Sequence, residues 1–260
     1  MGTTRAALTD VDLRTLLKGA TADERAVAAH KLCRTIDREE LSDEERTIAA
    51  DILRVMAADA AELVRRALAV TLKSSDVLPH DVALKLARDV ESISLPLLNF
   101  SPVFTDDDLA EIVRLGGPVR QVAIARRPVL SEKVTGAIVD FGGESAVETA
   151  CANDNAAFSE SVLQRALDRF EKSEQVLAAV AYRNVLPLAV TERLISMVGD
   201  QVREHLLNNH ALSPETALTI AVGATERATV DLVDQAGRAA DPKAFAAHLK
   251  QTRITVLFLT

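Results

Sequence analysis

Residues 118–141 of this 260-residue chain read PVRQVAIARRPVLSEKVTGAIVDF, and this stretch decides the fold. Apolar residues stand at helical spacing up to Ala125, and again from Glu132 onward. Between the two apolar segments, Leu130 precedes Ser131, a residue type that favours the start of a helix. An apolar residue directly before such a cap can pack on the first helical turn. The stretch therefore predicts two short helices joined by a turn.

The same arrangement occurs six times along the chain. Each copy has a Leu or Phe anchor, followed by Ser, Thr or Pro, between two apolar helices. The anchors are Leu78, Phe104, Leu130, Phe158, Leu186 and Leu212, with spacings of 26, 26, 28, 28 and 26 residues. A nearly fixed period of this length is typical of stacked helical arrays. We therefore expect an all-α protein: a right-handed α-solenoid of HEAT-like helix pairs of about 26–29 residues, with about fifteen to eighteen helices.

Aligned columns of the first helices support the repeat. One column holds Val64, Ile93, Val119, Val147, Val176 and Val202. The column four residues later holds Leu68, Leu97, Ala123, Cys151, Val180 and Leu206. Residues four apart lie on one face of a helix, so each helix carries an apolar stripe that a single pair cannot bury. Stacked neighbours would bury it, at roughly 25 cal/mol per Å² of apolar surface.

Local signals mark where these helices begin and end. Thr105, Ser131, Ser159 and Ser213 directly follow anchors and are expected N-caps, and Thr105 forms a capping pair with Asp108. Gly116–Gly117 and Gly142–Gly143 stand between copies and are expected helix stops. The helices should therefore be short and separated by tight turns.

The sequence divides into three regions. Thr21 with Glu24 and Ser42 with Glu45 are capping boxes that should open two longer helices, about 22–36 and 42–57, before the repeats. Further helical patterns stand at about 226–237 and 241–251. We expect an N-terminal helical capping region at 1–58, six helix-pair repeats at 59–226 and C-terminal helices at 227–260.

The last residues, 254–260, are apolar and carry no stop signal. They are expected to begin a helix that continues beyond the chain, which would make the chain a fragment of a longer protein. The alternative is a short C-terminal strand or tail packed on the last repeat.

Composition argues against several classes of partner. The chain has a net charge of −8, no Trp and one Tyr, whereas nucleic-acid binders normally present a basic face and often stacking aromatics. Cys33 and Cys151 fit no metal-ligand spacing and favour a reducing compartment. Residues 1–21 lack the features of a secretory signal, and no apolar run approaches the roughly 18 residues of a membrane span. We expect a cytoplasmic protein without a membrane partner, metal or cofactor.

A polar column three residues before the anchor contains the candidate site. It holds Arg127, Asn155, Arg183 and Asn209, while Ser75 and Ser101 occupy it in the first two copies. The structural interpretation is that Asn ends the first helix and Arg bonds its last carbonyls. The functional interpretation is a polar ladder and basic spot that takes an acidic peptide, a phosphate or a carboxylate. The candidate partner-binding residues are Arg120, Arg126, Arg127, Asn155, Arg183 and Asn209.

The segment Leu63–Met197 resembles DUF2336, a bacterial family of unknown function found mainly in alphaproteobacteria. The resemblance rests on Val64-Arg65 with Leu68-Ala69, Leu86-Ala87-Arg88-Asp89, Leu95-Pro96-Leu97-Leu98, Arg120-Gln121-Val122-Ala123-Ile124-Ala125-Arg126-Arg127 and Arg183-Asn184-Val185-Leu186-Pro187. The Arg-Gln-x-Ala-Ile-Ala stretch is its most specific part. Thr252 to Thr255 also resembles a family segment, from which the chain departs after Thr255. The resemblance implies HEAT-like or leucine-rich-variant-like helical repeats and no particular activity.

The expected function is a non-catalytic scaffold or adaptor that binds another protein or peptide, since the repeat is clear and no catalytic arrangement occurs. One alternative is a sensor that binds a phosphorylated small ligand or nucleotide at an Arg-rich face. Another is a nucleic-acid-binding HEAT-like protein, such as a DNA glycosylase, against which charge and aromatic content argue. Homo-oligomerisation is left open.

Overall fold

The computed structural model describes residues 10–38, 41–213 and 216. Within these residues it contains fourteen α-helices and no strand, which confirms the predicted all-α class. The chain divides into two compact units, Met1–Asn208 and Asn209–Thr260. The helices expected at 226–237 and 241–251 and the apolar tail at 254–260 lie outside the described residues.

Three helices precede the repeats: α1 (Asp10–Lys18), α2 (Ala22–Arg38) and α3 (Asp43–Ala57). The first helices of the repeats are α4 (Glu62–Thr71), α6 (Glu91–Phe100), α8 (Pro118–Ala125), α10 (Glu144–Cys151), α12 (Glu174–Ala181) and α14 (Asp200–Asn209). The second helices are α5 (His80–Ala87), α7 (Asp106–Leu115), α9 (Glu132–Phe141), α11 (Glu160–Arg169) and α13 (Leu188–Met197). Helices α2 and α3 match the two expected near residues 22–36 and 42–57, whereas α1 was not predicted.

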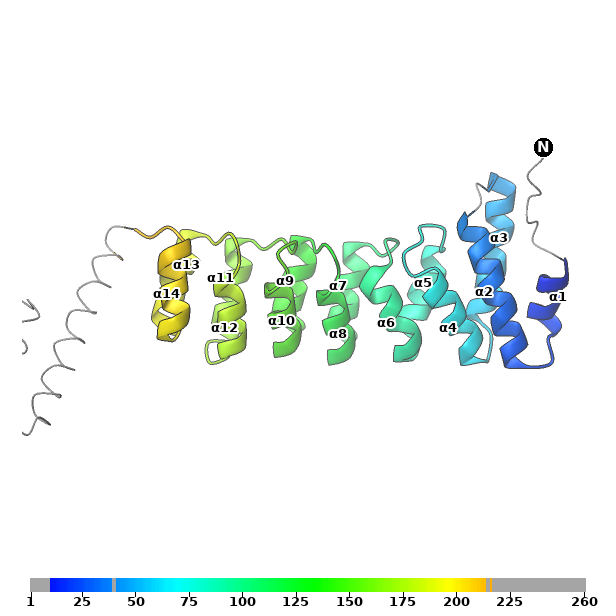
Figure 1. The fold of residues 1–260 in the computed structure, drawn as a ribbon, viewed down its shortest axis with the longest axis horizontal. Coiled ribbons are helices and arrows are strands. Elements are labelled where there is room, and N and C mark those ends of the chain that lie inside the picture. Colours follow the sequence, from blue (N-terminus) through cyan, green and yellow to red (C-terminus); the bar gives the residue numbers. More distant parts are fainter. Residues whose placement is uncertain (1–9, 39–40, 214–215, 217–260) are drawn as a thin grey trace, which may run out of the picture. The chain divides into compact units, whose positions relative to one another are not determined.

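Most helices two apart along the chain pack against each other (Figure 1). One series of contacts runs from α2 through α4, α6, α8 and α10 to α12. In the other series, α3 contacts α5, and α7, α9, α11 and α13 follow one another. Each second helix from α5 to α11 also contacts the first helix that follows it. The apolar columns of neighbouring copies therefore bury one another: Leu68, Leu97, Cys151 and Val180 are all inaccessible to solvent.

Most of the expected helix starts are present. Thr105 and Asp108 form a full capping box at α7, and the Ser131 hydroxyl accepts a hydrogen bond from the Val134 amide at α9. Within the second unit, the Ser213 hydroxyl accepts from the Thr216 amide. The prediction for Ser159 was wrong in its chemistry: its side chain makes no cap bond to α11 and lies 3.2 Å from the Ser161 hydroxyl instead.

The two glycine pairs end helices as expected, and the reason is a close backbone approach. The Gly116 amide donates to the Ile112 carbonyl at the end of α7, and Gly142 donates to Ile138 in the same way at the end of α9. A Cβ at Gly116 would lie 2.4 Å from the Ile112 oxygen, and one at Gly142 would lie 2.5 Å from the Ile138 oxygen. Only glycine fits these positions without a shift of the backbone.

Candidate functional site

Two of the predicted side chains, Arg127 and Arg183, reach across to the preceding repeat. After α8, the Arg127 guanidinium donates from Nη1 to the Leu98 carbonyl (2.9 Å) and from Nη2 to the Ser101 carbonyl (2.8 Å), at the end of α6. The acceptors thus belong to the neighbouring copy. The interpretation that Arg bonds the last carbonyls of its own helix was therefore wrong, because the helix ends of successive copies lie side by side.

Arg183 repeats this arrangement after α12. Its Nη1 donates to the carbonyls of Cys151 (2.8 Å) and Asn153 (3.1 Å), and its Nη2 donates to Ala156 (2.8 Å). The guanidinium also lies 4.7 Å from the centre of the Phe158 ring. Burial lowers the pKa of Arg183, as it lowers that of Arg127. These guanidinium groups are held among backbone carbonyls, so they are poorly placed to bind a ligand.

The copy between them uses Asn153, two residues before the predicted Asn155. The Asn153 side-chain amide donates to the Arg127 carbonyl at 2.8 Å. Asn153 stands two residues after the end of α10, as Arg127 and Arg183 stand two residues after α8 and α12. Counting back from the anchor misses it, because Phe158 stands seven residues after the end of α10, whereas Leu130 and Leu186 stand five residues after α8 and α12. The position two residues after the end of the first helix identifies Asn153.

The six predicted residues do not form one cluster. Arg126, Arg127 and Asn155 line one open hollow of about 480 Å³, the Arg126 hollow, together with the carboxylate residue Glu148. Arg120 lines a different cavity, and Arg183 is bound to carbonyls between α10 and α12. The remaining residue, Asn209, ends α14 and is the first residue of the second compact unit.

Gln121 is a buried polar residue that is not among the six predicted site residues. Its Nε2 donates to the Val113 carbonyl (2.8 Å) and to those of Gly116 and Phe141 (both 3.3 Å), and its Oε1 accepts from the Gly143 amide (3.0 Å). One side chain therefore satisfies the ends of α7 and α9 and the start of α10. A polar residue within an otherwise apolar helical stretch was the available signal.

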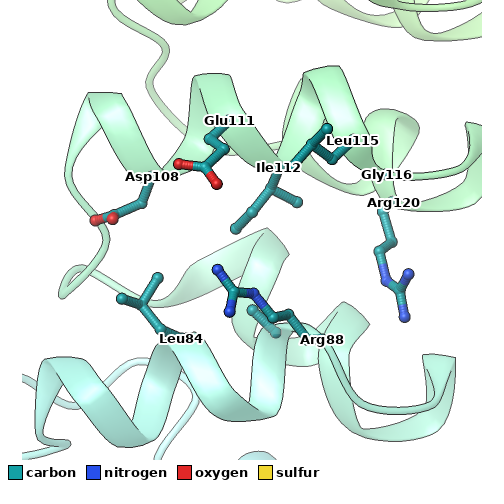
Figure 2. A pocket seen from close by; sticks show the side chains of 9 residues that line it. Leu84, Arg88, Asp108, Glu111, Ile112, Leu115, Gly116 and Arg120 are labelled. Atoms are coloured by element: carbon teal, nitrogen blue, oxygen red, sulfur yellow. The ribbon is translucent and has the colours of Figure 1, made fainter.

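The second cavity lies between α5 and α7 and has about 180 Å³ of space (Figure 2). Apolar side chains of Leu84, Ala87, Ile112 and Leu115 form part of its lining. Its position follows from helix length: α5 ends nine residues after its anchor, whereas α7, α9, α11 and α13 each end eleven residues after theirs. Because α5 stops early, the last turn of α7 lacks a helical neighbour there, and Leu115 is 75% exposed.

Charged side chains surround this α5–α7 cavity. Arg88, directly after α5, and Glu111 on α7 point into the gap from opposite sides (Figure 2). Arg120 donates from Nη2 to the Asp89 carbonyl (2.6 Å), while its buried Nε has no hydrogen-bond partner among the described residues. Burial acts to raise the pKa of Asp108, but hydrogen bonds from Thr105 and His80 outweigh it and lower that pKa. The Asp108 carboxylate thus already has hydrogen-bond partners.

The described residues contain no candidate metal site and no helix that could span a membrane. In the described part of the chain, no group of three or more His, Cys, Asp or Glu residues could hold a metal ion. Of the helices at 10–38 and 41–213, none has the length and apolar character needed to cross a membrane. Cys33 and Cys151 are buried free thiols, and burial raises the pKa of each to about 12. These cysteines are core residues.

Comparison with known families identifies the family of this chain. No curated protein matches the chain. A family model described as an uncharacterised protein conserved in bacteria matches residues 93–255, more than half of the chain. The match begins thirty residues after Leu63, where the segment that resembles the family begins. It extends beyond Met197 to Thr255, the residue after which the chain departs from the family's sequence. It includes Gln121 and every predicted site residue, and it places this chain in the DUF2336 family.

Proposed function

We propose that this protein is a non-catalytic cytoplasmic scaffold that binds another protein, built as a right-handed α-solenoid of HEAT-like helix pairs. Support comes from the two series of contacts between helices two apart, and from polar side chains that bond the backbone of the preceding copy. In such arrays each repeat contacts only its neighbours, which leaves an extended surface for a partner.

The observation that carries the proposal is the apolar surface at the ends of α7 and α9. Leu115 is 75% exposed and borders the α5–α7 cavity, while Phe141 is 46% exposed at the corresponding position of the next copy. The Arg114 guanidinium lies 4.8 Å from the centre of the Phe141 ring, so cationic and apolar groups are adjacent. Apolar side chains beside charged ones, around an unfilled cavity, are typical of protein-binding sites.

Affinity capture with the full chain as bait tests this function. Leu115→Glu places a charge at the proposed surface without entering the core, and Val70→Glu makes the same change at an exposed position of α4. We expect specific partners to be reduced about tenfold with Leu115→Glu, which corresponds to about 1.4 kcal/mol, and to be retained with Val70→Glu. Recovery of the same partners in equal amounts with both variants would contradict the assignment of this surface.

Charge reversal at Arg127 or Arg183 is unsuitable for that test, because these side chains hold helix ends. Arg126 is exposed and lines the Arg126 hollow, so Arg126→Glu is the appropriate variant for the predicted basic spot. Loss of partners with Arg126→Glu but not with Leu115→Glu would move the binding surface to that hollow.

A second candidate function is a sensor of a phosphorylated small ligand at the Arg126 hollow. Its volume of about 480 Å³ lies within the range of about 300–1,000 Å³ usual for small-ligand sites, and the exposed residues Arg126 and Asn155 line it. A thermal-shift screen with nucleotides tests it, because a ligand specific for the native state raises Tm. An unchanged Tm at millimolar nucleotide would exclude it in favour of the scaffold.

A further inference from the structure

We propose that the α5–α7 cavity is the anchor pocket for a partner peptide in which a large apolar side chain stands next to a carboxylate residue. The inference rests on the proposed scaffold function and names the chemistry of the segment that this scaffold binds. The cavity lies where α5 ends two residues earlier than the other second helices do, and the incoming side chain fills the space that those residues would occupy.

The cavity is large enough for one side chain of a partner but too small for a cofactor or a drug-sized ligand. Its volume is about 180 Å³, below the range of about 300–1,000 Å³ in which cofactors and drug-sized ligands bind. Leu84, Ile112 and Leu115 present aliphatic surface to it, and the first two are only partly exposed. Buried anchors in such pockets contribute most of the affinity of many protein interfaces.

The charges select a carboxylate beside that anchor. Arg88 is exposed and lines the cavity, and the buried Nε of Arg120 has no hydrogen-bond partner among the described residues. The Arg88 guanidinium extends into the gap toward Glu111, and Arg120 lies farther along the cavity beside Gly116 (Figure 2). A carboxylate that reaches the Arg88 guanidinium gains charge-assisted hydrogen bonds. Glu111 on the opposite side disfavours a dianionic phosphate, whose charge is about twice as large.

Peptide display on the full-length chain is the direct test. A library of random twelve-residue peptides is selected against the immobilised protein, and the Kd values of enriched peptides are measured by fluorescence anisotropy. We expect enrichment of Leu, Ile, Met or Phe next to Asp or Glu. Replacing that acid by its amide should weaken binding about tenfold, as for close charge pairs at interfaces.

Charge variants separate this pocket from the rest of the surface. Arg88→Glu should weaken the acidic peptides about tenfold and, in a repeated selection, enrich peptides with Lys or Arg in their place. Glu111→Gln removes a competing carboxylate and should tighten the acidic peptides about two- to fivefold. Arg66→Glu, at an exposed position of α4, is the matched control and should leave Kd unchanged. Circular dichroism confirms that each variant is folded.

Two outcomes would overturn the assignment. If enriched peptides bind Arg88→Glu and the wild type equally, or if no peptide is enriched, the cavity is not an anchor pocket for this chemistry. The scaffold function would then be judged separately, by whether the full chain captures specific partners that are lost with Phe141→Glu, because Phe141 is exposed at the same surface but does not line the cavity. Its failure is therefore distinguishable from failure of the pocket.

Discussion

At the residue scale, the buried side chain of Gln121 joins one copy to the next, and Gly116 ends the helix α7. Gln121 lies 6% exposed and bonds three carbonyls and one amide from two neighbouring helix pairs. Helix ends leave several carbonyls without an intrahelical partner, and a buried carbonyl without a hydrogen bond is costly. Gly116 has no side chain, which lets the Ile112 carbonyl oxygen approach its backbone closely at the end of α7.

Gln121→Glu tests the amide. The substitution keeps the shape of the side chain. It replaces the amide nitrogen, which donates to three carbonyls, with an oxygen that faces those carbonyls. We expect the free energy of unfolding to fall by about 2–4 kcal/mol, measured by urea denaturation at pH 7. Gln175→Glu, an exposed position on α12, is the control and should change it by less than about 0.5 kcal/mol. Equal effects of the two substitutions would show that the Gln121 bonds contribute little.

Two adjacent glycines provide a second test. Gly116→Ala places a Cβ 2.4 Å from a backbone oxygen, whereas a Cβ at Gly117 meets nothing within 4 Å. The backbone must shift in the first variant, so we expect a loss of about 1–3 kcal/mol. Gly117→Ala should stay within about 1 kcal/mol of the wild type, because its backbone is extended and open. Thermal unfolding measures both, and similar Tm values for the two variants would refute the close approach.

At the element scale, the first helices are tied together at their C-terminal ends. Arg127, Asn153 and Arg183 each stand two residues after a helix and each donate to carbonyls of the preceding copy. These contacts link the ends of α6, α8, α10 and α12 in sequence. The second helices behave differently, since α5 is shorter than α7 and leaves the α5–α7 cavity between them.

Arg183→Met measures the strength of one such link. It keeps much of the apolar stem and removes all three bonds to the carbonyls of Cys151, Asn153 and Ala156. We expect a loss of about 2–3 kcal/mol and faster amide hydrogen exchange in α12. Arg183→Lys should recover only part of the loss, because an ammonium cannot reproduce the planar fork of donors. Exchange in α12 that is unchanged in both variants would contradict the link.

At the scale of the whole unit Met1–Asn208, ion pairs also join successive helix pairs. Arg25 bonds Asp59 at 3.0 Å, and Arg65 bonds Asp89 at 2.6 Å, each pair being mostly shielded from solvent. Arg54–Asp81, Arg165–Asp140 and Arg193–Asp168 make more exposed pairs of the same kind. Hydrogen bonds from the Arg partners are the main cause that lowers the pKa of Asp59, Asp81 and Asp89.

Stability should therefore fall in acid. A carboxyl whose folded-state pKa lies below the unfolded value of about 3.9 stabilises the fold above that value, because the unfolded state binds more protons. We expect Tm to be constant from pH 7 to about 5 and to decrease as pH drops through 4 towards 3. Asp89→Asn should lower Tm at pH 7 and flatten this decrease, as followed by circular dichroism. A variant that keeps the full wild-type pH dependence would show that Asp89 is not among the groups responsible.

The sequence by itself determined the features that depend on near neighbours along the chain. The all-α class, the capping boxes at Ser42 and Thr105 and the helix stops at Gly116 and Gly142 follow from contacts within one turn, which residue types report directly. The family could be recognised for the same reason, since the Arg-Gln-x-Ala-Ile-Ala stretch is contiguous.

Only the tertiary structure decided where the polar side chains of the repeat go. Arg127, Gln121 and Arg183 bond atoms about twenty to thirty residues away, and their partners depend on how successive helix ends lie beside one another. An anchor-based alignment selected Asn155 where Asn153 makes the contact, because inserted residues shift the count without moving the helix end. The α5–α7 cavity likewise arises from the packing of two helices of unequal length, a relation that no single segment of sequence contains.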